Sequence, residues 1–204
     1  MVLMLELLLA ALLAASPAGP TDRPRPHEIE WRRSVAVGEP EAGSLVRGVM
    51  LPSEGRHWVS WDPVEREKPN RWWRRWGTDR LVRTTLGVVR DYADDHPGAP
   101  RVLIGDMSRP RGGDFGTDYG PIGHATHQNG LDVDVYYPRL DRRERPPRSV
   151  DQVDVGLAQE LVDLFVAAGA TTVYVGPNLP LDGPPGVVTP LANHDNHLHA
   201  RIAP

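Results

Sequence analysis

The sequence contains no cysteine among its 204 residues. This absence excludes disulfide frameworks, thiol nucleophiles and cysteine-ligated metal sites, but an oxidising compartment remains compatible with it. Lysine is nearly absent too, because Lys68 is the only one and arginine supplies almost all the positive charge. No apolar run reaches the roughly 20 residues that a membrane-spanning helix needs, and no internal repeat is visible. We therefore expect a chain without an integral membrane span.

The composition is that of an ordinary globular protein. Hydrophobic residues make up 40% and charged residues 25% of the chain, so one domain can bury a core. The formal net charge is -4, and the arginines alternate with acidic residues along the chain. Because no basic block is present, we expect no nucleic-acid partner. The sequence leaves the oligomeric state open.

The N-terminus has the pattern of an export signal. Residues 2–15 are apolar except for Glu6, and the small, turn-forming residues 16–20 follow. This pattern predicts a signal peptide over residues 1–18 and export to the periplasm, cell envelope or exterior. No basic residue precedes Arg23, so a mis-assigned start or an uncleaved anchor is the alternative. Residues 19–42 are predicted to form a flexible Pro-rich lead.

The hydrophobic pattern of the remaining chain predicts an α+β fold. Apolar spacing and end signals predict two helices, one from a threonine cap to Pro97-Gly98 and one that stops at Gly169. We expect one domain over 43–204, with a mostly antiparallel central sheet and flanking helices. The predicted helices are 78–96 and 155–168, the strands are 101–104, 131–137, 171–175 and 197–202, and the main loops are 109–123 and 141–148.

Five of the eight histidines lie in two short segments, 124–134 and 194–199. Without thiolates, Zn²⁺ prefers imidazole and carboxylate, and a catalytic zinc usually has three protein ligands and a water. His197 and His199 are two apart on a predicted strand, so both project from one face. Asp132 and Asp134 share a face in the same way. Gly130 can supply the turn that brings His127 over the start of that strand.

Each motif alone has an ordinary structural explanation. A His-x-His pair is often a surface or hydrogen-bonded pair, and an Asp-x-Asp pair on a strand is often only solvated. Other hydrolase signatures are missing: His27-Glu28 lacks the second histidine of a metalloprotease helix, and no G-x-S-x-G nucleophile motif occurs. The two histidine segments are informative because they occur together, and their combination predicts one metal site.

These segments resemble those of the penicillin-insensitive murein endopeptidases. That family belongs to a zinc peptidase superfamily that includes lysostaphin-type enzymes, D-alanyl-D-alanine metallopeptidases and the hedgehog signalling domain. The similarity runs from about Gly43 to the C-terminus and also covers the stretches 51–52, 76–77, 104–108 and 112–113. Thr126 stands where the family pattern leads us to expect serine.

The resemblance implies the roles of individual residues. It implies one Zn²⁺ per chain, held by His127, Asp134 and His199, with His197 as the catalytic histidine. Asp132 would be a neighbour of the ligands. His124 and His194 would line the site and touch substrate, order water or support the ligands. Mn²⁺ or Co²⁺ also suits two imidazoles and a carboxylate.

The implied activity is endopeptidase cleavage of peptidoglycan peptide stems, at D-alanyl-meso-diaminopimelyl cross-links. A D,D-carboxypeptidase or dipeptidase would use the same metal constellation, and a hydrolase of ordinary L-peptides is a further alternative. A zinc-binding or wall-binding module without catalysis is the alternative from another class. In that module His124 or His194 would close the fourth coordination position.

Two arginine-containing stretches have open roles. Arg109 or Arg111 could hold a peptide carboxylate by a forked hydrogen bond, or pair structurally with Asp114 or Asp118. The second stretch, residues 71–77, contains three tryptophans that could stack on sugars. For Trp76 we expect a core anchor before the first helix, because tryptophan buries a large area.

Overall fold

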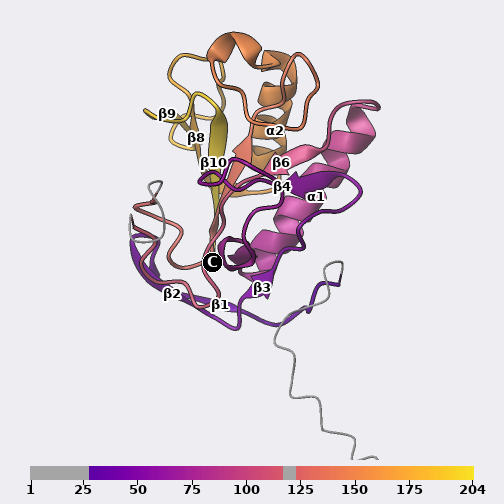
Figure 1. The fold of residues 1–204 in the computed structure, drawn as a ribbon. Coiled ribbons are helices and arrows are strands. Elements are labelled where there is room, and N and C mark those ends of the chain that lie inside the picture. Colours follow the sequence, from indigo (N-terminus) through magenta and orange to yellow (C-terminus); the bar gives the residue numbers. More distant parts are fainter. Residues whose placement is uncertain (1–27, 117–122) are drawn as a thin grey trace, which may run out of the picture.

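The computed structural model describes residues 28–116 and 123–204. Within these ranges one six-stranded sheet has the order β4-β6-β7-β10-β8-β9, and two small sheets are formed by β1-β2 and β3-β5 (Figure 1). The predicted signal peptide, residues 19–27 of the lead and Asp118 lie outside the described residues. The strands are β1 (Val35–Glu39), β2 (Ala42–Val46), β3 (Val49–Met50), β4 (Trp58–Ser60), β5 (Trp76–Gly77), β6 (Val102–Ile104), β7 (Asp132–Tyr136), β8 (Ala170–Val175), β9 (Val188–Pro190) and β10 (His197–Ile202).

Both predicted helices are confirmed. Helix α1 (Asp79–Asp95) begins at Thr78, whose side chain accepts a hydrogen bond from the Leu81 N–H at 3.1 Å. Helix α2 (Val155–Ala167) begins at Asp154 in the same way and ends before Gly169, which has a φ of 88°. Short 3-10 helices, η1 (Trp72–Arg74) and η3 (Val150–Gln152), precede β5 and α2.

The central sheet is mixed, so the prediction of a mostly antiparallel sheet holds only for its middle. Strands β6, β7, β10 and β8 pair antiparallel, whereas β4 pairs parallel to β6 and β9 pairs parallel to β8. The outer strands β4 and β9 have three residues each. Unlike the equally short β6, which is an unbroken apolar run, β4 ends in a serine and β9 contains a threonine and a proline, so the sequence did not predict them.

Side chains alternate along the strands, so one face of the sheet packs against the helices and the other face carries the polar residues. Val133 and Val135 of β7, and Leu198 and Ala200 of β10, are buried in one core cluster with the apolar faces of α1 and α2. The residues between them point to the opposite face, because neighbouring residues in a strand face opposite ways. All the histidines and carboxylates considered below on β7 and β10 therefore lie on the face away from the helices.

The β1–β2 hairpin braces the loops beside this second face. The Leu45 N–H donates to the Arg111 carbonyl at 2.8 Å, and the Gln128 N–H donates to the Pro40 carbonyl at 3.0 Å. Strand β1 lies in the range for which the sequence predicted a lead. There the chain forms a hairpin because β1 and β2 pair over their full length, from Val35 opposite Val46 onward.

No helix in residues 28–116 and 123–204 combines the length and apolar character needed to cross a membrane.

Candidate metal centre

The register between β7 and β10 places the predicted site residues opposite one another. His199 lies opposite Asp134, and Arg201 lies opposite Asp132. His197 lies opposite Tyr136, whose ring centroid is 5.8 Å from that of the histidine. Tyr137 faces the other way and is buried in the core. Two strands that are distant in the sequence thus supply one cluster of polar side chains.

The loop before β7 brings two more histidines over the same face. His127 has a φ of 71° and Gly130 has a φ of 78°, so the chain turns back through two left-handed residues. The His127 N–H donates to Asp132 Oδ2 at 3.2 Å, which fixes the loop on the start of the strand. The predicted turn at Gly130 is confirmed, while the left-handed backbone of His127 was not predicted.

Four histidines each direct one ring nitrogen toward the Asp134 carboxylate. His199 Nδ1 is 3.1 Å and His127 Nε2 is 3.3 Å from Asp134 Oδ1. His124 Nδ1 is 3.7 Å from Oδ2, and His197 Nε2 is 4.0 Å from Oδ1. Exposure separates them into pairs: the His127 and His199 side chains are 0% and 5% exposed, whereas those of His124 and His197 are 16% and 17% exposed.

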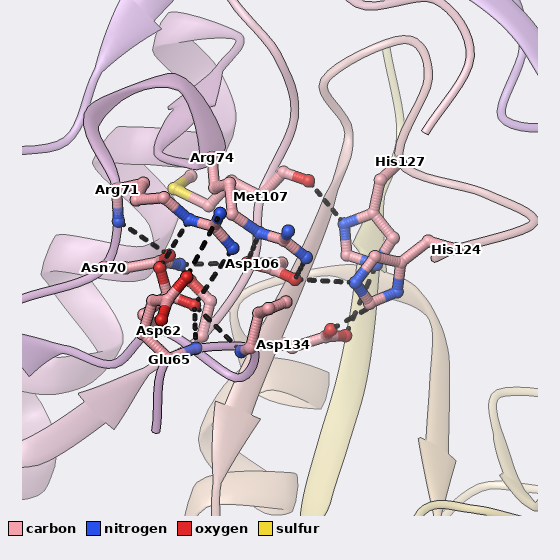
Figure 2. A network of polar contacts seen from close by, with 12 residues as sticks. Asp62, Glu65, Asn70, Arg71, Arg74, Asp106, Met107, His124, His127 and Asp134 are labelled. Carbon is pink, nitrogen blue, oxygen red and sulfur yellow. Dashed lines mark hydrogen bonds and ion pairs between the residues drawn. The ribbon is translucent and has the colours of Figure 1, made fainter. Parts of the chain in front are cut away.

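The second ring nitrogen of each histidine meets a protein acceptor. His127 Nδ1 is 2.6 Å from the Met107 carbonyl oxygen, and His199 Nε2 is 2.9 Å from Asp132 Oδ1. His197 Nδ1 is 2.6 Å from Asn196 Oδ1. His124 Nε2 is 2.7 Å from Asp106 Oδ2 (Figure 2). When the ring nitrogens that face these protein acceptors carry the protons, the nitrogens that face Asp134 are left without a proton and can accept.

Such a cluster of acceptors needs a cation. Burial would raise the pKa of Asp134, but the facing His127 and His124 hold it well below its usual value, so the carboxylate stays charged. Burial lowers the pKa of His197 to about 4. Burial also acts against charge on His199, but its hydrogen bonds with Asp132 and Asp134 raise its pKa to about 9. In the absence of a metal, a proton on His199 can serve as the cation.

The distances among three of these groups fit a metal ion. His127 Nε2 is 3.2 Å from His199 Nδ1, and both lie 3.1 to 3.3 Å from Asp134 Oδ1. Tetrahedral zinc with bonds of about 2.1 Å separates its ligand atoms by about 3.4 Å. The group His124, His127 and Asp134 also offers three ligand atoms, which lie within 4.8 Å of one another. The geometry favours the closer triangle with His199, and the ligand assignment stays a prediction.

The outer hydrogen-bond acceptors are themselves held in place. Asp132 Oδ1 accepts from Arg201 Nε at 2.6 Å, so an arginine supports the carboxylate behind His199. Asp132 bonds His199 on the side away from Asp134, and its role as a neighbour of the ligands stays a prediction. Asp132 pairs with Arg201, and Asp106 pairs with Arg74. Asp134 differs from these two carboxylates, because the four histidines are its ion-pair partners.

The remaining predicted residues lie at different places. The His194 ring stacks on His197 with centroids 4.8 Å apart, and its Nδ1 is 2.9 Å from the Ala192 carbonyl oxygen. Arg109 donates to the Asp114 carbonyl at 2.6 Å, a structural contact, while Arg111 is exposed. Among the tryptophans, Trp72 is 54% exposed. Trp76 is half-buried in β5 and is not one of the buried core residues.

Sequence reasoning missed the residues that support the loop histidines. Asp106 is 1% exposed and bonds His124, the Met107 carbonyl bonds His127, and the Phe115 ring lies 5.1 Å from the His124 ring. Burial would raise the pKa of Asp106, but hydrogen bonds from Arg74 and His124 outweigh it and lower the pKa to about 2. The signal was an acidic residue two positions after the apolar strand 102–104, since a buried carboxylate must have partners.

Fold and site together define an α+β protein with a candidate histidine–carboxylate metal centre on the face of its sheet away from the helices. The family model described as penicillin-insensitive murein endopeptidase matches residues 36–164. This chain belongs to the penicillin-insensitive murein endopeptidase family, which confirms the resemblance seen in its motifs.

Curated relatives agree with this membership. Proteins named "Penicillin-insensitive murein endopeptidase" from Escherichia coli O1:K1, strain SMS-3-5 and O45:K1 are each 32% identical to the chain over 127 residues. The matched region is 62% of this chain and 39% of each relative. The family match includes His124, His127 and Asp134 but ends before β10. The histidines of β10 are joined to this group by the structure.

Proposed function

We propose that this protein is a zinc-dependent endopeptidase that hydrolyses D-alanyl-meso-diaminopimelyl cross-links of peptidoglycan. The observation that carries the proposal is the convergence of four histidine nitrogens on Asp134 in a chain of the murein endopeptidase family. Family membership supports the substrate class, and the donor set supports a metal-assisted hydrolysis. The proposed catalytic domain covers residues 43–204, and strand β1 joins it by pairing with β2.

One zinc ion would be held by His127, Asp134 and His199. His127 and His199 are the most buried of the four histidines, and their ligand atoms lie within 3.3 Å of each other and of Asp134 Oδ1. The Met107 carbonyl and Asp132 would orient the two imidazoles from behind. When bound, zinc polarises a carbonyl and lowers the pKa of a bound water to about 7.

His197 is the proposed catalytic residue. Its Nδ1–H can donate to Asn196 Oδ1, which leaves Nε2 as a proton acceptor on the partly exposed side of the centre. Because burial lowers its pKa to about 4, His197 is neutral at neutral pH. His197 Nε2 would accept a proton from the water that attacks the peptide carbonyl, and would then donate it to the departing amine. His194 stacks on this ring and would restrict its rotation.

The peptide substrate would reach the site from the side where His124 and His197 are exposed. Arg109 and Arg111 remain the candidates for a substrate carboxylate, although the contact between Arg109 and Asp114 favours a structural role for Arg109. A double substitution of both arginines that leaves the Michaelis constant unchanged would remove this assignment. We further propose that residues 1–18 act as a signal peptide, so that the enzyme meets its substrate in the periplasm or cell envelope.

The activity can be tested with purified, cross-linked peptidoglycan. The protein without residues 1–18 is loaded with one equivalent of zinc, and the released muropeptides are followed by mass spectrometry. We expect cross-linked dimers to disappear with the unsubstituted protein and to persist with His197→Ala. His96→Ala is the matched control, because His96 ends α1 and pairs with Glu160 at 3.4 Å, away from the cluster.

The other outcomes identify the alternatives. Loss of a terminal D-alanine with intact dimers would show a D,D-carboxypeptidase. Bound zinc without any change in the muropeptides would favour a non-catalytic zinc or wall-binding module.

A further inference from the structure

Asp106 lies at the centre of a buried polar network behind His124 (Figure 2). Arg74 donates to both of its oxygens, from Nε to Oδ1 at 2.7 Å and from a terminal nitrogen to Oδ2 at 2.5 Å. Asn70 Nδ2 donates to Oδ1 at 2.9 Å. His124 Nε2 is 2.7 Å from Oδ2. The carboxylate therefore faces donors on all sides, and a charged carboxylate has no proton of its own to offer.

This arrangement determines which nitrogen of His124 carries the hydrogen. Since Asp106 can only accept, the nitrogen that faces it, Nε2, must donate. When a metal ion in the centre keeps the imidazole neutral, its single N–H lies on Nε2 and Nδ1 keeps a lone pair. Nδ1 is the nitrogen that faces Asp134 Oδ2 at 3.7 Å. We propose that Asp106, clamped by Arg74 and Asn70, is a positioning residue that fixes His124 with its bare Nδ1 toward the metal centre.

Arg74 and Asp106 are held in place by the residues that surround them. Arg74 is 0% exposed, and its guanidinium lies 4.9 Å from the Phe115 ring and 5.1 Å from the Trp73 ring. The Asp134 N–H donates to the Asp106 carbonyl at 2.9 Å, so the backbone of Asp106 is fastened to β7 itself. Phe115 also packs on His124. A shift of His124 therefore requires movement of several buried groups.

His199 is supported by an arginine-paired aspartate in the same way as His124. Behind His199, Asp132 is paired with Arg201 and bonds His199 Nε2, while His199 Nδ1 faces Asp134. His124 and His199 thus present the same ring nitrogen to one carboxylate, and each is held at the other nitrogen by an arginine-paired aspartate. Carboxylates behind imidazoles fix the tautomer and ring orientation at metal sites, which is the function that we assign to Asp106.

The tautomer of His124 can be measured in the unsubstituted, zinc-loaded protein. Histidine ¹⁵N NMR spectra at about pH 9, where a free imidazole is neutral, distinguish a protonated from a bare ring nitrogen. The His124→Ala spectrum identifies which signals belong to His124. We expect a proton on Nε2 and none on Nδ1. A proton on Nδ1, with or without one on Nε2, would overturn the proposal.

A double-mutant cycle tests whether Asp106 acts through His124. The hydrolysis readout rests on the proposed activity, whereas zinc affinity and the NMR tautomer require only that the protein binds zinc. We expect Asp106→Asn to lower zinc affinity or kcat/KM by roughly 10–100-fold. The loss should be no greater in Asp106→Asn/His124→Ala than in His124→Ala alone, because the group that Asp106 orients is already gone.

Losses that multiply in the double variant would show a merely structural role and overturn the proposal. Equilibrium unfolding of each variant separates this result from loss of the fold. If Asp106→Asn does not fold because the buried Arg74 loses the Asp106 carboxylate, the tautomer in the unsubstituted protein decides the question. Absence of hydrolysis by the unsubstituted protein would count against the proposed function and leave the tautomer measurement intact.

Discussion

His199 lies directly opposite Asp134 across the β7–β10 pair, with His199 Nδ1 3.1 Å from Asp134 Oδ1. The cross-strand register alone therefore brings together two groups that are 65 residues apart in the sequence. Residues opposite each other in antiparallel strands are the closest neighbours that a sheet offers. The middle of the sheet consequently holds this pair in place.

Removal of a direct ligand should cost more zinc affinity than removal of the group behind it. We expect Asp132→Asn to weaken zinc binding by roughly 10–100-fold and His199→Ala to weaken it further. His96→Ala should bind zinc as the unsubstituted protein does. Competition with a chromophoric chelator gives the three affinities, and equal affinities for His199→Ala and His96→Ala would refute the proposed ligand set.

Zinc affinity should rise with pH. Zinc needs an unprotonated His199, whose pKa in the metal-free protein is raised to about 9 by Asp132 and Asp134 against the effect of burial. Below that pKa each pH unit should cost up to about tenfold in affinity, because a proton must be displaced. Chelator competition between about pH 6 and pH 9 measures the slope. A flat profile would show that His199 does not lose a proton on binding.

Glu144 should contribute stability at neutral pH that is lost in acid. Hydrogen bonds from Arg101, aided by Lys68 and opposed by burial, lower the pKa of Glu144 to about 2. The folded-state pKa is thus below the unfolded value of about 4.3, so the stabilisation is complete above about pH 4.3 and fades as pH falls toward 2. Because the pair is partly exposed, we expect about 1 kcal/mol or less.

Urea unfolding of Glu144→Gln at several pH values checks this expectation. The variant should be less stable than the unsubstituted protein at pH 7 and should approach it near pH 2. Glu39→Gln, at an exposed strand position, is the matched control. A difference between Glu144→Gln and the unsubstituted protein that is constant over the pH range would disprove the linkage.

Leu198→Ala should destabilise the fold strongly. Leu198 is 0% exposed and lies on β10, between β7 and β8, against the helices. Truncation of a buried leucine costs about 2–5 kcal/mol, since a cavity remains. Leu140→Ala should change the free energy of unfolding by no more than about 0.5 kcal/mol, because Leu140 is 62% exposed. Denaturant titration of both variants measures the contrast.

Much of the fold could be predicted from local patterns. The helices α1 and α2 have apolar faces at helical spacing with cap residues at their ends, and β7 and β10 alternate as strands do. The parallel outer strands β4 and β9 could not be predicted, because their pairing depends on contacts between distant segments and not on their own three residues. The β1–β2 hairpin was missed because its Pro-rich, charged surroundings resemble a linker.

The site was predictable as a set of residue types but not as an arrangement. Spacing showed that His197 and His199 share a face, and that Asp132 and Asp134 do, yet the register that opposes them is a tertiary property. The support given to His124 by Asp106 depends on a loop position after β6, which no periodicity describes. The left-handed backbone of His127 was equally invisible, because a non-glycine residue rarely adopts it.

Strand β10 follows every other strand of the sheet in the chain, yet it occupies an inner position between β7 and β8. During synthesis the loop histidines and Asp134 leave the ribosome first, and their two partners on β10 emerge more than 60 residues later. The proposed metal centre and the middle of the sheet are therefore completed in the same event. A nascent or truncated chain without β10 lacks both, so the proposed activity cannot begin before β10 has joined the sheet.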